Sequence, residues 1–374
     1  MIPYVKGKVA QQAHVAIPEG LFEEEYGRNG FYGNYAHFYR KEPLVAWSRI
    51  EGALRPRAYD LIKSPQHSPD FIHNRTLYLY NEDLKIYFAS VEKPMSSFFR
   101  NADGDELFFI HKGEGRIYTD FGPLDYKKGD YVVIPRGTIY QMSPTQATQV
   151  FLIESMSEIR LPDKGLLGHT AFFDPALMGI PEPEAYPHVQ SEYELVIKRQ
   201  GALTHVYYPF CPINAVGWKG TLTAWKINVD QIRPISCDRY HLPPSAHSTF
   251  VADNFIVVSF LPRPLEVGDA EAVKVPFFHS NIDFDEVIFY HSGDFFSRAG
   301  INEGMITFHP QGIHHGPHKN AMERSKAAQK TDEIAVMVDT RRPLNIAEGA
   351  EKVENVDYWK SWGNYNHEKQ SARS

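Results

Sequence analysis

The hydrophobic positions of this chain fall in short runs separated by turn residues, a pattern typical of strands and not of long helices. Strand-like runs in the first half lie at 76–80, 85–91, 106–111 and 131–135. Turn clusters at Asn101–Gly104 and Gly122-Pro123 separate some of them. A second β-rich region runs from Glu192 to about Asp339. Short helices are expected only near 322–330 and 356–362, so the pattern predicts an all-β fold.

The distribution of glycine, proline and aromatic residues predicts how the chain is divided. The first 60 residues have closely spaced glycines among tyrosines and phenylalanines, which indicates tight turns in an irregular arm. Residues 161–190 are rich in Pro and Gly and are expected to form a crossover linker. We therefore expect an arm and a first barrel in residues 1–160, and a second barrel with a helical tail in residues 191–374.

Composition narrows the functional class. The 374 residues are 43% hydrophobic and 13% aromatic, and they include 26 glycines and 26 prolines. This suits two domains of ordinary size with many strands and turns. A net charge of −7 gives no support for nucleic-acid binding. Two cysteines, no apolar leader and no long apolar run predict a soluble cytoplasmic protein without disulfides or membrane contact.

One segment near the C-terminus, from His279 to His318, carries the candidate chemistry. His279, Glu286 and His315 offer two imidazoles and one carboxylate. His279 and Glu286 lie seven positions apart, an odd number that a straight strand would place on opposite faces, so a bulge is expected at residues 281–285. Two histidines and one carboxylate leave open positions on a metal, as in non-haem Fe(II) sites.

The spacing around these residues resembles the two cupin motifs. The first motif, roughly H-x-H-x4-E-x6-G, is represented by His279, Asn281, Glu286 and Gly293; the second, roughly G-x5-P-x-G-x2-H, is represented by Gly304, Pro310, Gly312 and His315. Asn281 replaces the second histidine, so three metal ligands are expected instead of four. The resemblance implies two cupin-like barrels of the double-stranded β-helix (jelly-roll) type.

The same template fits the first half of the chain without its metal ligands. Glu106 and Gly113 repeat the spacing of Glu286 and Gly293, and Gly129, Pro135 and Gly137 repeat the second motif. Phe99 and Tyr140, however, stand where His279 and His315 stand in the second half. We therefore expect a metal-free first barrel that acts as a scaffold, with His111 as a structural residue.

Longer matched segments resemble a particular family, the homogentisate 1,2-dioxygenases. They run in the same order from about Gly27 to Trp362 and include RNADGDELFF, GRIYTDFG, PFCPINAVGWKG, DRYHLPPS, FFHSN and FHPQGIHHGP. The resemblance implies that His279, Glu286 and His315 bind Fe(II). It also implies that His241 is the catalytic histidine that handles the phenolic proton, and that His309 is a further active-site histidine.

By this resemblance the substrates are O2 and a small hydroquinone, with homogentisate converted to maleylacetoacetate in tyrosine and phenylalanine catabolism. Arg298 would hold the side-chain carboxylate, and His315 and Asn281 would lie beside the substrate. Phe277 and Phe278 replace two family tyrosines, and Phe295 replaces a tyrosine that reaches the substrate. A more apolar pocket is therefore expected. Family members form oligomers, and an arm with exposed aromatic residues also suits a homo-oligomer.

Other interpretations of these residues remain open at this level. His241 could be a surface-loop histidine, His309 could orient a metal ligand, and Arg298 could form a surface ion pair. The chain could also be another metal-dependent cupin, such as a gentisate-like or related phenol dioxygenase or an isomerase. A storage or ligand-sensing bicupin is a third possibility. Complete ligands in one half and none in the other argue against this last class.

Overall fold

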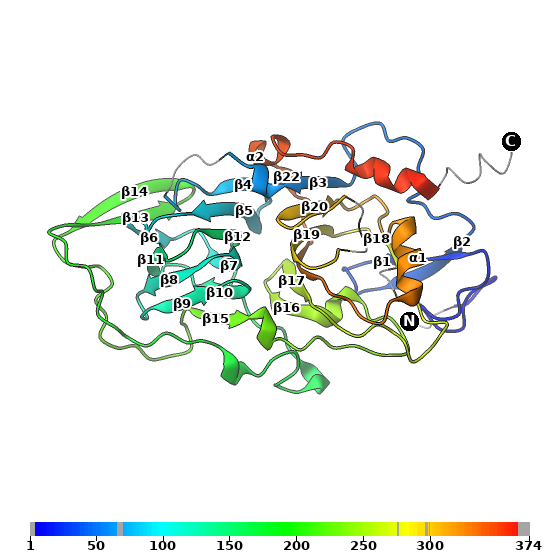
Figure 1. The fold of residues 1–374 in the computed structure, drawn as a ribbon, viewed down its shortest axis with the longest axis horizontal. Coiled ribbons are helices and arrows are strands. Elements are labelled where there is room, and N and C mark those ends of the chain that lie inside the picture. Colours follow the sequence, from blue (N-terminus) through cyan, green and yellow to red (C-terminus); the bar gives the residue numbers. More distant parts are fainter. Residues whose placement is uncertain (1–3, 66–69, 275–276, 296–297, 299, 366–374) are drawn as a thin grey trace.

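The structure is a computed structural model that describes residues 4–65, 70–274, 277–295, 298 and 300–365 (Figure 1). Within these residues the chain is mostly β, as the sequence predicts. Two bodies of strands lie side by side, and we call them the first and the second barrel. The only α-helices in the described part of the chain are α1 (Lys319–Ala327) and α2 (Glu348–Glu351).

Two facing sheets form the first barrel, on the left of Figure 1. Its strands are β4 (Thr76–Tyr80), β5 (Leu84–Val91), β6 (Phe98–Asn101), β7 (Asp105–Lys112), β8 (Glu114–Thr119), β9 (Leu124–Lys127), β10 (Asp130–Ile134), β11 (Ile139–Pro144), β12 (Thr148–Ser155), β13 (Tyr193–Arg199), β14 (Ala202–Tyr208), β15 (Trp225–Asn228) and β22 (Asn345–Ile346). One sheet has the order β15-β10-β7-β12-β5-β4-β22, and the other has the order β14-β13-β6-β11-β8-β9. Their inward side chains, among them Phe108, Ile110 and Leu152, form a single apolar core.

The second barrel consists of a six-stranded and a three-stranded sheet. Its strands are β1 (Phe22–Gly27), β2 (Tyr35–Arg40), β3 (Arg57–Asp60), β16 (Ser248–Val251), β17 (Phe255–Phe260), β18 (Phe278–Asn281), β19 (Asp285–Ser292), β20 (Met305–His309) and β21 (Ile334–Thr340). The larger sheet has the order β16-β17-β21-β19-β20-β3, and the smaller has the order β18-β1-β2. The arm is therefore more regular than expected, because β1 and β2 form an antiparallel pair that extends β18.

Strand pairing corrects the predicted division of the chain. Residues 191–228 were expected in the second barrel, but β13 pairs with β6 and β15 pairs with β10 in the first. Conversely, β1 and β3 come from the N-terminal arm and pair with β18 and β20 of the second barrel. The Pro- and Gly-rich stretch at 161–190 is thus a connection within the first barrel. Composition located this loop, but only long-range pairing decides which barrel follows it.

The two barrels share a large apolar interface built from strands β7, β12 and β19. Side chains alternate along these strands, so Phe109 and Phe289 point away from their own barrels and into a common core. The rings of Phe151 and Phe289 stack at 4.6 Å with an angle of 8° between them. His111 and His291 meet at the same interface, with their Nδ1 atoms 2.9 Å apart. His111 is therefore structural, as the sequence predicts.

The repeated glycines end equivalent strands in the two barrels. Gly113 follows β7 with φ of +85°, and Gly293 follows β19 with φ of +98°. A Cβ atom at Gly293 would lie 1.8 Å from the carbonyl oxygen of Asp332, and one at Gly113 would lie 2.4 Å from that of Ala147. Both positions thus require glycine, which explains why this part of the motif recurs although the metal ligands do not.

The helices lie close to where they were expected. Helix α1 covers Lys319–Ala327, against a predicted 322–330, and a 3₁₀ helix covers Tyr358–Tyr365, against a predicted 356–362. No helix in the described ranges is long and apolar enough to cross a membrane. Cys211 and Cys237 are both free thiols.

Candidate metal centre

Two strand ends bring His279 and His315 together inside the second barrel. His279 lies in β18, and His315 lies in the loop that follows β20. The two residues form an antiparallel bridge in which each backbone N–H donates to the other's carbonyl, at 3.0 and 3.1 Å. Their rings are 4.0 Å apart between centroids. A pair of backbone hydrogen bonds thus fixes two side chains that are far apart in sequence.

Glu286 completes the group from the neighbouring sheet. Its Oε2 atom lies 3.6 Å from Nε2 of His279 and 3.4 Å from Nε2 of His315. All three side chains are buried, and one ligand atom from each lies within 4.8 Å of the others. The expected bulge between His279 and Glu286 is instead a turn at 282–284 that carries the chain from β18 to β19. The parity conflict disappears because the two residues lie on different sheets.

The hydrogen bonding of these side chains leaves metal-facing atoms without partners. Nδ1 of His279 donates to the carbonyl of Phe277 at 3.0 Å, which leaves Nε2 with a free lone pair. Nε2 of His279 and Nε2 of His315 are both buried without a hydrogen-bond partner. Burial and the neighbouring His279 lower the pKa of His315 to about 3, so its ring is neutral near pH 7. Ring nitrogens without hydrogen-bond partners beside a carboxylate fit a divalent metal ion.

Glu286 is ionised, as a carboxylate that binds a divalent metal ion must be. Burial raises its pKa, but the neighbouring rings of His315, His279 and His309 outweigh burial and hold the pKa well below its ordinary value. Asp339 lies directly opposite Glu286 in the β19–β21 pair. Burial and the negative charge of Glu286 raise the pKa of Asp339 well above its ordinary value. Asp339 was not predicted; only strand register places it beside the site.

His309 lies behind the candidate ligands and does not line the cavity described below. Its Nδ1 atom is 2.6 Å from Oε1 of Glu286, and its Nε2 atom is 3.2 Å from the hydroxyl of Tyr358. The ring is fully buried and stacks on His315 at 4.7 Å. His309 therefore orients two of the three ligands. Its predicted catalytic role has no support from this position, because it is not among the residues that line the cavity described below.

The equivalent position in the first barrel is filled by an arginine. Nη1 of Arg75 donates to Oε1 of Glu106 at 2.5 Å, and the hydroxyl of Tyr140 donates to Oε2 of Glu106 at 2.7 Å. The guanidinium also lies 4.6 Å from the ring of Phe99. Among the described residues, no group that could hold a metal occurs here. The prediction of a metal-free first barrel thus has a physical basis, because the guanidinium of Arg75 neutralises Glu106 at the position that a metal ion would take.

A cavity opens onto the metal ligands of the second barrel. Its lining includes His279 and Glu286, together with His241, Phe277 and Tyr290. His241 is 6% exposed, and its Nδ1 atom lies 3.1 Å from Oε1 of Glu266. Burial lowers the pKa of His241, and Glu266 opposes this effect. His241 is therefore a cavity residue and not the surface-loop histidine that the sequence left open. Glu266 was not predicted, because no motif marks it.

Charged side chains line the cavity as well. They are Arg263, Lys274, Arg298 and Glu333. Arg298 is 7% exposed and donates from Nη1 to the carbonyl of Gly316 at 3.0 Å, so it is not a surface ion-pair residue. Burial raises the pKa of Glu333 to about 7, although Arg298 opposes this shift. Three cationic side chains thus line the cavity beside an apolar wall.

The phenylalanines that replace family tyrosines differ in their position relative to the cavity. Phe295 is not among the residues that line the cavity; its ring packs edge-on against Tyr290 at 5.0 Å, within the barrel core. The contact of Phe295 with the substrate stays a prediction, and the lining of this cavity does not support it. Of the two phenylalanines before the first ligand, Phe277 lines the cavity, whereas Phe278 packs against Phe22. The side chain of Asn281 lies outside the described part of the chain.

The fold and the site together define this chain as a two-barrel protein of the cupin class with a candidate metal site in its second barrel. The family model "Homogentisate 1,2-dioxygenase N-terminal" matches residues 65–229, and "Homogentisate 1,2-dioxygenase C-terminal" matches residues 239–369. The chain belongs to the homogentisate 1,2-dioxygenase family. The gap between the matches falls between β15 and β16, where strand pairing also separates the barrels.

Individual relatives lie at different distances. A Saccharolobus solfataricus protein named "Putative dioxygenase SSO1533" is 34% identical, and the match covers 96% of this chain and 98% of the relative. The homogentisate 1,2-dioxygenase of Nitrobacter hamburgensis is 27% identical over 71% of this chain, which spans only 62% of that protein's length.

Among solved structures, protein Ylba from E. coli aligns with a TM-score of 0.38 and 9% identity, over 80% of this chain and 96% of its own. A "Cupin 2 conserved barrel domain protein" from Leptotrichia buccalis aligns with a TM-score of 0.29 and 10% identity, over 72% of this chain and 88% of its own.

Proposed function

We propose that this protein is an Fe(II)-dependent ring-cleaving dioxygenase that acts on a hydroquinone-type aromatic acid, with homogentisate the favoured substrate. The observation that carries the proposal is the buried group of His279, Glu286 and His315. Two of its members, His279 and Glu286, line a cavity that also holds His241. Two histidines and one carboxylate leave free positions on a metal for both substrate and dioxygen. Fe(II) held there would supply the activation of dioxygen that organic side chains lack.

The residues around the cavity suit a substrate with a phenol at one end and a carboxylate at the other. A phenol has an ordinary pKa of about 10, so its deprotonation near neutral pH needs a base. Burial lowers the pKa of His241, so its imidazole is neutral and able to accept the proton. Arg263, Lys274 and Arg298 are the candidates to bind the carboxylate, since each lines the cavity. Phe277 supplies an apolar wall for the ring.

The proposed reaction balances without any further reactant. Homogentisate takes up both atoms of O2, and maleylacetoacetate differs from it only by these two added oxygen atoms. One ring carbon–carbon bond breaks and the O–O bond breaks, while two new carbon–oxygen bonds form. His241 takes the phenolic proton and returns a proton to the ring-opened product, so no net acid or base is consumed.

Substrate-dependent oxygen uptake tests this function. Protein reconstituted with Fe(II) without air should consume one O2 per homogentisate, and His315→Ala should abolish uptake because it removes a ligand. A panel with gentisate and with alkyl-substituted hydroquinones separates the homogentisate reaction from a related phenol dioxygenase. No uptake with any dihydroxyaromatic by protein that has bound Fe(II) would overturn the dioxygenase proposal. A preference for gentisate would change the substrate only.

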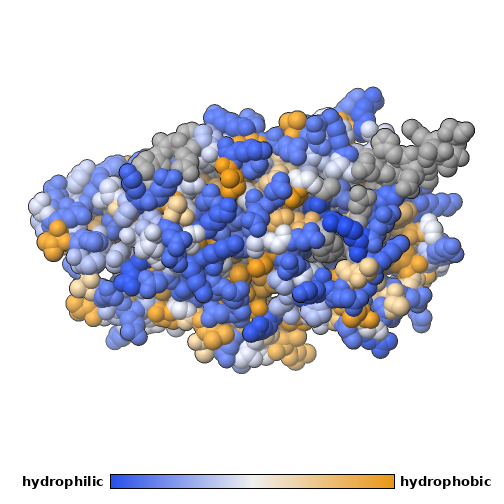
Figure 2. Space-filling model, in the orientation of Figure 1, coloured by the Kyte–Doolittle hydropathy of each residue, from blue (hydrophilic) through white to orange (hydrophobic). Residues whose placement is uncertain are grey.

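The assembly and location of the protein are further proposals. Large apolar side chains are exposed in the arm and in the 161–222 region, among them Tyr35 at 66%, Leu166 at 107% and Val216 at 98%. On the face of the molecule drawn in Figure 2, small apolar patches are scattered over a mostly hydrophilic surface. We propose that some of these side chains are covered in a homo-oligomer in the cytoplasm. Light scattering that gives the mass of one chain would contradict it.

A further inference from the structure

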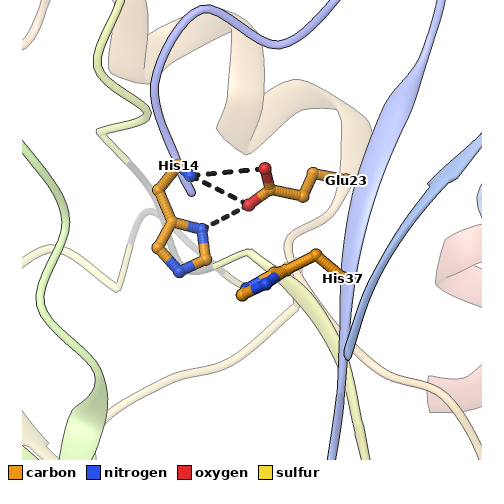
Figure 3. Close-up of side chains that lie close together, drawn as sticks. All are labelled: His14, Glu23 and His37. Carbon is orange, nitrogen blue, oxygen red and sulfur yellow. Dashed lines mark hydrogen bonds and ion pairs between the residues drawn. The ribbon is translucent and has the colours of Figure 1, made fainter. Parts of the chain in front are cut away.

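A second group of histidine and glutamate side chains lies in the arm, apart from the candidate metal centre. His14, Glu23 and His37 each place a ligand atom within 4.8 Å of the others (Figure 3). Glu23 comes from β1 and His37 from β2, and His14 comes from the loop that precedes β1. Neither the family resemblance nor the cavity involves these residues.

The β1–β2 pair explains why these side chains converge. Glu25 lies directly opposite His37, and Glu23 lies directly opposite Tyr39. Residues two apart on a strand share a face, so all four side chains lie on one face of the pair. The register therefore gives one face of the β1–β2 pair a polar surface, and the side chain of His14 packs against that surface at Glu23.

The backbone at His14 is held in an unusual conformation. Its φ is +63°, a value uncommon for residues other than glycine. Its N–H donates to Glu23 Oε1 at 3.0 Å, and its carbonyl accepts from the N–H of Val273 at 2.9 Å. These bonds hold the strained turn in place, and the turn aims the imidazole at the carboxylate. Such strain often marks a functional site.

Two nitrogens in this group have the same signature as the metal-facing nitrogens of the second barrel. Nδ1 of His14 lies 2.6 Å from Oε1 of Glu23, yet the geometry does not make a hydrogen bond. Nε2 of His37 lies 3.3 Å from Oε2 of Glu25 and is also without a hydrogen-bond partner. Both atoms are buried. Buried ring nitrogens that lie beside carboxylates without making a hydrogen bond are atoms that a metal ion would satisfy.

The charge balance around β1 supports the same conclusion. Glu24, on the other face, is paired with Arg40 at 2.9 Å and His314 at 3.3 Å. Glu23 and Glu25 are 3% and 9% exposed, and no lysine or arginine in the described ranges pairs with either. Burial raises the pKa of Glu23, but His14, Tyr39 and His37 outweigh it and lower the pKa below its ordinary value. Two buried carboxyl groups without a lysine or arginine partner suit a bound cation.

We infer that His14, Glu23 and His37 form a second metal site, which binds a divalent transition ion of the zinc type. Imidazole nitrogen and carboxylate oxygen are ligands that Zn²⁺ accepts. Glu25 lies beside the group, with its Oε2 atom 3.3 Å from Nε2 of His37. The ion would join the arm to the second barrel. Glu25 is the register partner of His279, and His14 stacks on Phe277 at 4.1 Å. The arm site therefore supports the strand and the cavity wall that precede the first ligand.

Zinc binding by the full chain with its catalytic ligands removed tests this site. The double variant His279→Ala/His315→Ala, stripped by chelator, should still bind one Zn²⁺ per chain in calorimetry. Adding His14→Ala and His37→Ala should weaken that binding more than about 100-fold, because ligand loss exceeds the 10–100-fold effect of a supporting residue. Co²⁺ in the same site should give visible d–d absorption that disappears with these changes. Adding His205→Ala is the matched control, because His205 forms an exposed pair with Glu194 at 2.7 Å.

The outcome that overturns the inference is a folded double variant that binds no Zn²⁺, or that binds it equally well without His14 and His37. The group would then be a hydrogen-bonded histidine–glutamate cluster. If the quadruple variant does not fold, metal content of the otherwise wild-type chain decides the question. Two ions per chain should fall to one in Glu23→Gln, and an unchanged content in that variant would equally contradict the site.

Discussion

His241 owes its environment to one residue that no sequence motif marks. Glu266 lies 3.1 Å from Nδ1 of His241 and is itself held by Arg263 at 3.0 Å. The negative charge of Glu266 favours a proton on the nearby Nδ1 atom, which leaves Nε2 to accept one. The carboxylate also opposes the effect of burial on the pKa of His241. Glu266 is thus a positioning residue for the proposed base.

Glu266→Gln should therefore shift the pH dependence of the reaction. Loss of the negative charge lowers the pKa of His241 further, so the acidic limb of the kcat/KM profile should move to lower pH. His241→Ala should instead remove the limb and lower kcat by about 10²–10⁴-fold with the metal retained. The measurement is oxygen uptake from about pH 5 to 9, the range in which imidazoles titrate. A limb that stays in place in Glu266→Gln would mean that another group is the base.

At the scale of the elements, β7 and β19 are equivalent strands that solve the same electrostatic problem in two ways. The second residue of each strand is a buried glutamate, Glu106 or Glu286, and it lies opposite another acidic residue, Glu154 or Asp339. In the first barrel Arg75 pairs with Glu106, and Lys198 pairs with Glu154. In the second barrel three histidines and the proposed metal surround Glu286. In the first barrel the side chain of Arg75 thus takes the place that the proposed metal ion has in the second barrel.

Arg75→Met should accordingly destabilise the first barrel strongly. It leaves Glu106 buried without a counter-charge, a loss of about 3–5 kcal/mol in the free energy of unfolding. The double variant Arg75→Met/Glu106→Gln should recover part of this loss. Arg116→Met is the matched control, because Arg116 forms a more exposed pair with Asp125 and its loss should cost less than about 1 kcal/mol. Equal losses for Arg75→Met and Arg116→Met in denaturant unfolding would contradict this account.

At the scale of the whole molecule, the barrels are joined by equivalent surfaces. His111 and His291 end the outward faces of β7 and β19 and hydrogen-bond to each other across the interface. Burial, with the partner histidine and two lysines, lowers the pKa of His111 to about 2. Burial and the same lysines lower the pKa of His291 to about 3. Both rings are therefore neutral in the folded protein.

This pair should make the stability of the protein fall in acid. Below about pH 6.5 the unfolded chain takes up two protons that the folded chain does not, so the contribution present above that pH is lost as the pH falls. Each proton adds a slope of about 1.4 kcal/mol per pH unit. His111→Leu/His291→Leu should reduce the slope between about pH 4 and 6 by up to two protons, measured by urea unfolding. The exposed His205→Leu is the control; the same slope in both variants would refute the role of the pair.

Much of the chemistry was predictable because it depends on local spacing. Strands, turns and required glycines follow from short-range sterics and from the alternation of side chains, so the two barrels and the ligands His279, Glu286 and His315 could be identified in sequence. The expectation of a metal-free first barrel rests on the same kind of local pattern, with Phe99 and Tyr140 at the ligand positions.

Only the tertiary structure decided which distant residues meet. Arg75 reaches Glu106, Glu266 reaches His241 and Asp339 faces Glu286 through strand pairing or loop packing that no local pattern encodes. The domain boundary was misplaced for the same reason, since β13 and β15 pair back onto the first barrel. His14 joins Glu23 and His37 only because β1 and β2 add to β18. Local sterics fix the conformation of each segment, whereas long-range hydrogen bonding and burial select its partners.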